Sequence, residues 1–297
     1  MMGLLRRLIG RKKDPASIPT SPVDRGALPT PSRFDVGWIT DVGKARAHNE
    51  DTALVTTAAY DDDGGLSPFG LFAVADGMGG HQAGEVASSL AARVAADYVT
   101  RHYYMPSFLD QEPAANQPAL TNVLMAAVRA ANRAVSSEAP GSGTTLTCAL
   151  VLGVQVYVAH VGDSRAYVLT EEGLEQITHD HSLVDRLVNE GRLTPDEAAV
   201  HPQKNVLYRA VGQGGVLDVD THVRTIQPGD YLLLCSDGLW GLVDEEDIAS
   251  LIKRASSSQG ACEDLVAAAN QAGGSDNITA IIWRSPLGEG YGRRCLE

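Results

Sequence analysis

Hydrophobic and polar residues follow two spacings along this chain, and each spacing predicts a different kind of element. Short apolar runs bounded by turn residues are typical of strands. They occur at residues 34–40, 52–55, 71–75, 144–151, 154–161, 165–169, 231–235 and 278–283. Apolar residues repeated at helical spacing predict two long helices, at residues 84–102 and 119–137.

Helix-capping signals predict two short helices between strands. Ser182 is followed by Asp185 three positions later, and Thr194 by Glu197 with a proline between them. Further helices are expected after residue 244 and at residues 261–272. Because strands occur in runs and helices in pairs, without regular β-α-β alternation, the pattern favours an α+β fold with mainly antiparallel sheets.

The composition is that of an ordinary globular protein and adds mainly a charge argument. The chain has 297 residues, of which 44% are hydrophobic and 21% charged, and a formal net charge of −13. A general nucleic-acid-binding function is disfavoured, since it would require a basic surface. The acidity suits a protein that concentrates carboxylates around cations, although acidity can also serve solubility alone.

The cysteines and the longest apolar runs indicate the compartment. Cys148, Cys235, Cys262 and Cys295 are far apart and form no C-x-x-C pair. A disulfide framework is therefore not expected, and we expect the protein to work in a reducing cytoplasm. No window approaches the ~18 consecutive apolar residues of a membrane-spanning helix.

The two ends of the chain differ from its middle. Residues 2–13 are basic and apolar on one side, and residues 14–33 are rich in proline, serine and threonine. A disordered arm over residues 1–33 is the favoured interpretation. The alternative is a weak tether that holds the protein peripherally at an anionic membrane or at an acidic partner. We expect one globular domain over residues 34–285 and a tail over residues 286–297.

Five aspartates stand at the ends of predicted strands. They are Asp51, Asp76, Asp163, Asp237 and Asp276. Asp76 and Asp237 each follow an apolar run and precede a glycine, so that the backbone can turn and leave the carboxylate at the strand tip. Any one of the five alone would be an ordinary turn residue, and Gly162-Asp163-Ser164 in particular predicts a hairpin turn. Five such placements in one domain favour a shared site.

Converging carboxylates repel one another unless a cation compensates their charge. The candidate ligands are all oxygens, and no His/Cys spacing suggests zinc, so Mg²⁺ or Mn²⁺ is the chemical choice. Two ions about 3.5–4 Å apart, bridged by one carboxylate, could activate a water for phosphoester hydrolysis. Arg46 could bind two oxygens of a substrate phosphate, although a surface salt bridge is an equal alternative.

Seven motifs follow one another in a specific order. They are Arg46-x-x-Asn49-Glu50-Asp51, Asp76-Gly-Met-Gly-Gly80, Gly143-Thr-Thr145, Gly162-Asp-Ser-Arg165, Asp180-His-Ser182, Ser236-Asp-Gly238 and Ser275-Asp-Asn277. With these motifs the chain resembles the metal-dependent PP2C (PPM) protein serine/threonine phosphatases, and among them the compact bacterial type, over residues 34–284. The resemblance implies a four-layer α-β-β-α sandwich of two antiparallel sheets flanked by helix pairs, with a metal site in a cleft at one end.

The same resemblance implies two Mn²⁺ or Mg²⁺ ions and assigns residues to them. The ligands would be Asp76 as the bridge, the Gly77 carbonyl on one ion, Asp237 and Asp276 on the other, and Glu50 and Asp51 through water. Asp163 would complete a third, weaker metal site, and Arg46 would bind the substrate phosphate. Residues 182–215, beginning at Ser182, correspond to a mobile flap beside the cleft that is thought to influence substrate choice.

Met78 departs from the animal and plant members, in which a histidine at this position is a proposed general acid. Bacterial relatives commonly share the methionine, so the departure leaves only the proton donor open. His48 and His81 are nearby in the sequence, and a water could serve instead. For each histidine an ordinary surface or loop position is the favoured interpretation.

The sequence therefore predicts a monomeric phosphatase that uses a metal-activated water to hydrolyse phosphoserine and phosphothreonine in proteins, reversing a cognate bacterial Ser/Thr kinase. Another two-metal phosphoesterase, such as a nuclease, is disfavoured by the charge of −13 and the lack of a basic groove. A catalytically silent domain that binds phosphoproteins is disfavoured because it would not need the full set of strand-end acids.

Overall fold

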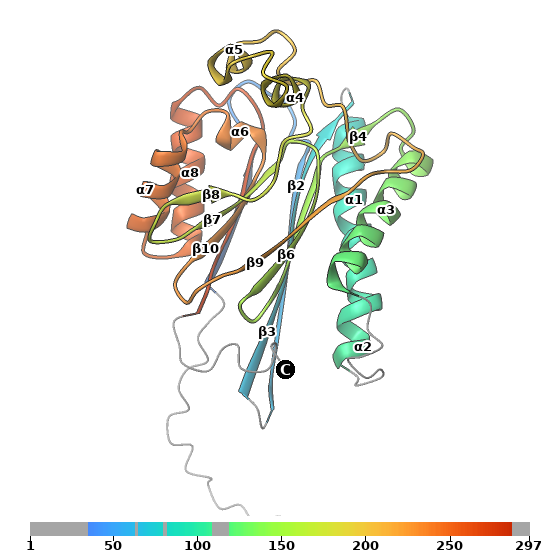
Figure 1. The fold of residues 1–297 in the computed structure, drawn as a ribbon, viewed down its shortest axis with the longest axis vertical. Helices are drawn as coiled ribbons and strands as arrows, with labels where there is room; N and C mark the ends of the chain where they lie inside the picture. The colour runs from blue at the N-terminus through green and yellow to red at the C-terminus, as the bar shows by residue number, and fades with distance from the viewer. Residues whose placement is uncertain (1–34, 63–64, 80–81, 109–118, 287–297) are drawn as a thin grey trace, which may run out of the picture. The chain divides into compact units, whose positions relative to one another are not determined.

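Two antiparallel sheets face each other in the structure, a computed structural model that describes residues 35–62, 65–79, 82–108 and 119–286 (Figure 1). The strands of the first sheet, in spatial order, are β1 (Asp35–Asp41), β11 (Ile278–Arg284), β10 (Tyr231–Cys235), β7 (Arg165–Leu169) and β8 (Leu174–Gln176). Those of the second are β2 (Asp51–Asp62), β3 (Gly65–Met78), β5 (Leu146–Leu152), β6 (Gln155–Val161) and β9 (Asp220–Thr225), and β4 (Gly143–Thr144) pairs with the end of β3. Every strand pair is antiparallel, as expected.

The unbroken apolar runs of the sequence are strands buried on both faces. In β3, Leu71 and Ala73 belong to a core beneath helices, whereas Phe72 and Val74 belong to the core between the sheets. The last strand, β11, divides its residues in the same way between two cores. Because side chains alternate across a strand, a strand covered on both faces loses the usual polar alternation and becomes continuously hydrophobic.

Two pairs of helices cover the outer faces of the sheets (Figure 1). On the second sheet lie α1 (Gln82–Val99) and α3 (Leu120–Glu138); on the first lie α7 (Glu245–Arg254) and α8 (Ser258–Gln271). Helix α3 buries Val123, Leu124 and Ala127 at helical spacing against its sheet. The predicted α+β sandwich of four layers is therefore confirmed.

The first long helix ends earlier than predicted. After α1 the backbone continues as a π-helical turn, η1 (Thr100–Tyr104), and then as one turn of α-helix, α2 (Met105–Phe108). The carbonyl of Tyr98 lies 2.9 Å from Nδ1 of the His102 side chain, and the two rings stack.

The flap segment carries the two predicted short helices, α4 (Leu183–Asn189) and α5 (Pro195–Ala199), at the top of Figure 1. Ser182 caps α4 by accepting a hydrogen bond from the Asp185 N–H at 3.1 Å. Thr194 and Glu197 form a complete capping box on α5. Both capping predictions are confirmed.

The predicted hairpin at Gly162-Asp163-Ser164 is wrong. Strand β6, before it, belongs to the second sheet, and β7, after it, belongs to the first, so the segment carries the chain from one sheet to the other. Gly162 has a φ of +114°, which made the residue look like a hairpin glycine. A short connection between two strands predicts a turn but does not say whether those strands pair with each other.

Other elements are longer than predicted or were not predicted. Strands β2 and β3 extend well beyond residues 52–55 and 71–75, and Asp76 lies inside β3 rather than after it. The short strands β8 and β9 have little apolar pattern and were missed. The single turn α6 (Asp237–Trp240) stands where only a turn was expected.

Several sequence predictions fall outside the described residues. These are the disordered arm over residues 1–33, the C-terminal tail from residue 287, Cys295 and His81. Cys148, Cys235 and Cys262 are buried free thiols, as expected. Within the described ranges, the helices are all too short or too polar to cross a membrane.

Candidate functional site

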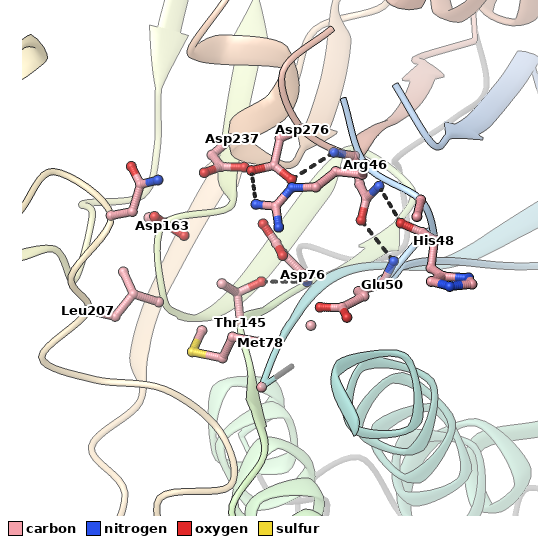
Figure 2. A pocket seen from close by; sticks show the side chains of 15 residues that line it. Arg46, His48, Glu50, Asp76, Met78, Thr145, Asp163, Leu207, Asp237 and Asp276 are labelled. Atoms are coloured by element: carbon pink, nitrogen blue, oxygen red, sulfur yellow. Dashed lines mark hydrogen bonds and ion pairs between the residues drawn. The ribbon is translucent and has the colours of Figure 1, made fainter. Parts of the chain in front are cut away.

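A cavity of about 430 Å³ opens where the ends of both sheets meet the flap (Figure 2). Four of the five strand-end aspartates line it. Asp76 comes from β3, Asp163 from the crossing between the sheets, Asp237 from the start of α6, and Asp276 from the loop before β11. Residues that are far apart in the sequence therefore reach one space, as the sequence predicted.

The pairing of β2 with β3 places Asp76 in the cavity. Asp51 and Asp76 are direct partners across the two strands. The Asp76 N–H donates to Thr145 Oγ1 at 2.8 Å, and its carbonyl accepts from the Thr145 N–H at 2.9 Å and from Thr144 Oγ1 at 2.8 Å. Because its backbone groups are all bonded within the sheet, the carboxylate projects from a rigid base.

Asp51 lies behind the cavity wall and is 7% exposed. Its Oδ2 accepts a hydrogen bond from Ser236 Oγ at 2.7 Å, whereas its buried Oδ1 has no hydrogen-bond partner. Burial, more than the neighbouring charges of Asp237 and Asp276, raises the pKa of Asp51 to about 7.

Burial, together with neighbouring charges, raises the pKa values of three aspartates that line the cavity, Asp76, Asp163 and Asp237. Burial and then the charge of Asp276 raise the pKa of Asp237 to about 6, and the buried Oδ1 of Asp237 has no hydrogen-bond partner. Burial also raises the pKa of Asp76 and of Asp163 well above the usual range. The charges that act on Asp76 come from Asp51, Asp237, Asp163 and Asp276. The negative charges of these aspartates are therefore not balanced by nearby positive charges in the described part of the chain.

Asn277 holds the loop before β2 against the loop before β11. Its Oδ1 accepts from the Glu50 N–H at 2.8 Å, and its Nδ2 donates to the carbonyls of Val42 and His48 at 3.0 Å each. Its own N–H donates to Asp276 Oδ1 at 2.9 Å. One amide side chain thus fixes the loop that carries Arg46 and Glu50 beside Asp276.

Arg46 lies at the mouth of the cavity, where its Nη2 is 2.7 Å from Asp276 Oδ2 (Figure 2). The side chain is 53% exposed, and its hydrogen bond to Asp276 raises its pKa. The salt bridge that the sequence offered as an alternative for Arg46 therefore exists, and its partner is Asp276, one of the aspartates that line the cavity. The guanidinium remains accessible from the cavity.

Gly77 is required by close packing. Its N–H donates to the Glu50 carbonyl at 3.2 Å, and a Cβ built on Gly77 would lie 2.6 Å from that same oxygen. Gly84, at the start of α1, is similarly close to the Glu50 carboxylate. The glycine after Asp76 therefore allows three segments to approach each other at the base of the cavity.

Asp163 is held through its main chain. Its carbonyl accepts a hydrogen bond from Trp240 Nε1 at 3.0 Å, and Trp240 lies on α6, the helix that starts at Asp237. The guanidinium of Arg165 stacks on the Trp240 ring at 3.6 Å and forms a forked ion pair with Asp180. The segments that carry Asp163 and Asp237 are thus joined.

The predicted proton donor His48 is not brought to the acids. The His48 side chain is exposed, and its ring points away from the four carboxylates in Figure 2, although the residue borders the cavity. His81 lies outside the described residues. Ser182 caps a helix and does not line the cavity. Met78 contributes an apolar wall beside Gly143.

Six further cavity-lining residues had no role assigned from the sequence: Ala47, Gly79, Thr145, Asn205, Leu207 and Asn277. Thr145 and Asn277 end two of the seven motifs, so the motifs themselves contained the signal. Asn205 and Leu207 come from the flap, after α5, and no local pattern distinguishes them from other loop residues.

The donor set fits a hard divalent cation. The four aspartates that line the cavity offer only oxygen ligands, and the unbonded Oδ1 atoms of Asp51 and Asp237 are ligand or water positions that protein groups do not fill. Across the described ranges, no three His, Cys, Asp or Glu side chains come close enough together to hold an ion by themselves. Water molecules and backbone oxygen would therefore have to complete each coordination shell.

Comparisons with known proteins agree with this geometry. The model of the protein phosphatase 2C family matches residues 46–271. A serine/threonine phosphatase stp of Listeria welshimeri is 36% identical over 249 residues, which cover 82% of this chain and 92% of the relative. The crystal structure of the Mycobacterium tuberculosis serine/threonine phosphatase PstP/Ppp has a TM-score of 0.70 at 35% identity and covers 84% of this chain and 98% of its own. The PstP catalytic domain in complex with two manganese ions has a TM-score of 0.68 at 36% identity, over 84% and 96% of the two chains.

Proposed function

The chain belongs to the protein phosphatase 2C family, and on that premise we propose that it hydrolyses phosphoserine and phosphothreonine in proteins with the aid of divalent cations. The convergence of four aspartates from four separate elements, beside an accessible arginine, is the observation that carries the proposal. Such a cavity suits a phosphate monoester, whose charge requires both metal ions and a guanidinium.

We propose that two cations, Mn²⁺ or Mg²⁺, bind between the acids. Asp76 is the proposed bridge, because the charges of all four other aspartates act on it. The other proposed ligands are the Gly77 carbonyl, Asp237, Asp276 and, through water, Glu50 and Asp51. Asp163 is the proposed ligand of a third, weaker ion. Two observations support this assignment: the mutual repulsion of the carboxylates, and the buried Oδ1 atoms of Asp51 and Asp237 that have no hydrogen-bond partner among the described residues.

Bound cations would supply an activated water and offset the phosphate charge. The protein residues then determine the geometry. The guanidinium of Arg46 would break its ion pair with Asp276, or keep one of its N–H groups there, and bind two phosphate oxygens. This contact would direct the phosphorus toward Asp76. Because the His48 ring points away from the acids, we propose that a water, rather than His48, protonates the leaving serine or threonine oxygen (Figure 2).

Phosphorylated proteins are the substrates, and we propose a cognate bacterial Ser/Thr kinase as the enzyme that produces them. A monomer in the cytoplasm is the proposed working form, with residues 34–285 as its catalytic domain. The buried free thiols of Cys148, Cys235 and Cys262 are consistent with a reducing compartment. Contact of residues 2–13 with a membrane or an acidic partner remains the lesser proposal for the arm.

Phosphate release from a phosphothreonine peptide tests the proposal directly. We expect Mn²⁺-dependent release that EDTA abolishes and that is lost in Asp76→Ala and in Asp237→Ala. The matched control is Asp264→Ala, which removes an exposed carboxylate of α8 far from the cavity lining and should leave the activity unchanged. Full activity in EDTA, or in either cavity variant, would refute the mechanism.

A further inference from the structure

Four side chains gather at the base of the flap, outside the acidic cavity. His181 lies just before the flap, Tyr208 and Arg209 lie in its returning segment, and Asp220 begins β9. We call them the His181 cluster. None of the four lines the cavity, and none is assigned a role in the phosphatase reaction.

His181 binds Gly162 twice. Its N–H donates to the Gly162 carbonyl at 2.7 Å, and its ring Nδ1 accepts from the Gly162 N–H at 3.0 Å. The ring is 2% exposed. Gly162 immediately precedes Asp163, so this side chain fixes the backbone from which the Asp163 carboxylate projects.

The hydrogen bonds also settle the state and orientation of the ring. A backbone N–H can only donate, so Nδ1 is unprotonated and the ring proton is on Nε2. Nε2 lies 3.2 Å from Asp220 Oδ2 and 3.1 Å from Arg209 Nη1, and Arg209 Nη1 donates to Asp220 Oδ1 at 2.7 Å. Asp220 therefore accepts from both the ring and the arginine, and it holds the imidazole in the orientation that Gly162 requires.

The same residue joins the two ends of the flap. The His181 carbonyl accepts from the Tyr208 N–H at 3.0 Å, and the next residue, Ser182, forms a backbone bridge with Leu207. The Tyr208 ring packs against the His181 ring, with centroids 5.6 Å apart. Asn205 and Leu207, just before Tyr208, line the cavity, and Leu207 lies on the side of Asp163 in Figure 2.

We propose that His181 is a positioning residue that couples the flap to Asp163, with Asp220 and Arg209 orienting its ring. Movement of the returning flap segment would reach Gly162 through this ring and shift Asp163 with it. The coupling goes beyond hydrolysis itself, because it makes the position of one acid depend on what occupies the flap. Only the metal-binding role of Asp163 rests on the proposed function.

Hydrogen exchange on the full-length protein without added metal tests the coupling and needs no phosphatase activity. Arg209→Met removes the hydrogen bond to Asp220 and so weakens the His181 cluster at its flap residue. We expect the amides of Gly162 and Asp163, on the opposite side of His181, to exchange roughly tenfold faster, together with that of Tyr208. Amides of β3 and β11 should stay unchanged.

Four further variants sharpen this measurement. His181→Leu should accelerate exchange at the same amides, and His181→Asn, which restores an acceptor near the Nδ1 position, should recover protection at Gly162. His179→Leu is the matched control, because its side chain is exposed and makes no bond to Gly162. If His181→Leu does not fold, Arg209→Met and Asp220→Asn still decide the question. Faster exchange in the flap alone, with Gly162 and Asp163 unchanged, would overturn the proposal.

The loaded enzyme provides a second readout. We expect Arg209→Met to raise the Mn²⁺ concentration needed for half-maximal activity several-fold, and this shift to disappear when Asp163→Asn is also present. If Arg209→Met raised the required Mn²⁺ concentration equally with and without Asp163→Asn, Arg209 would not act through Asp163. If no variant, nor the parent protein, released phosphate, the proposed function would fail while the exchange result would still stand.

Discussion

The two sides of the cavity are built in different ways. On one side, Asp76 projects from a central strand whose backbone is bonded to β2, β4 and β5 and to two threonines. On the other side, Asn205 and Leu207 belong to the flap. It is fastened near its ends by the backbone bridges Ser182–Leu207 and Val211–Thr144, by a bond from the Gly212 N–H to Asn132 Oδ1, and by the His181 cluster. Acids whose mutual distances matter to chemistry thus stand on a strand or within two residues of a strand end, and the groups that meet a varied protein substrate stand on an exposed loop.

The strongest expected effect comes from the strand side. Replacing Asp237 by asparagine keeps its shape but removes one charge from the group that is to hold the cations. We expect kcat/KM to fall by roughly 10³-fold or more, because metal ions contribute several kcal/mol of transition-state stabilisation. Steady-state kinetics on a phosphothreonine peptide measures the loss. Near-parental activity would mean that Asp237 is not needed for the metal site.

Thr145→Val tests whether the strand side is rigid because of its hydrogen bonds. The change leaves the Asp76 N–H without its partner at 2.8 Å and breaks the contact with Ser164 Oγ. We expect the free energy of unfolding to fall by about 1–3 kcal/mol. Urea unfolding measures it, with Thr57→Val as the control, since Thr57 is exposed on β2. Equal stability of the two variants would contradict the expectation.

The acids should also make cation binding depend on pH. The pKa values of Asp51, about 7, and Asp237, about 6, are raised in the metal-free chain, so both carboxyls carry protons at pH 6 that are lost by pH 8. Because a cation requires the carboxylate forms, we expect Mn²⁺ to bind roughly tenfold more tightly at pH 8 than at pH 6, with release of protons at pH 6. Calorimetry in two buffers of different ionisation enthalpy measures both effects. Asp51→Asn should weaken the pH dependence, and equal affinity at both pH values would contradict it.

Leu207→Ala probes the flap side with a smaller expected effect. Leu207 borders the cavity, so its loss should raise KM for a phosphopeptide by roughly 2–10-fold while kcat for a small aryl phosphate stays the same. Val206→Ala is the matched control, because Val206 is its exposed neighbour and does not line the cavity. A loss of kcat equal to that of the strand-side variants would remove the distinction between the two sides.

Deletion of residues 1–33 should have the smallest effect. If residues 34–285 form the catalytic domain, kcat/KM for the peptide should remain within about twofold, as for other changes away from a site. The full-length chain is the control in the same assay. An inactive or insoluble deletion variant would show that the domain needs its arm.

The fold was largely predictable because its strands are buried on both faces. Such strands leave continuous apolar runs in the sequence, as β3, β10 and β11 do, and the acids at their ends could be found by position. The chemistry of the acids then followed from their shared oxygen donors.

What could not be predicted depends on partners that are distant in the sequence. The crossing at Asp163 looks like a hairpin because the residues themselves do not say which sheet the next strand joins. Asn277 bonds to Glu50 across 227 positions, and His181 reaches Gly162 and Asp220 from a loop without periodicity. These contacts exist only once the sheets have assembled, so no local pattern encodes them.

Trp240 also gives the protein an optical property. Its indole is hydrogen-bonded to the Asp163 carbonyl, lies under the Arg165 guanidinium and belongs to the helix that begins at Asp237. The other two tryptophans are remote from the acids, Trp283 inside the core between the sheets and Trp38 half-exposed on the edge strand β1. Intrinsic fluorescence can therefore report charge arriving among the aspartates without a substrate or a label, and the unmodified chain is its own sensor.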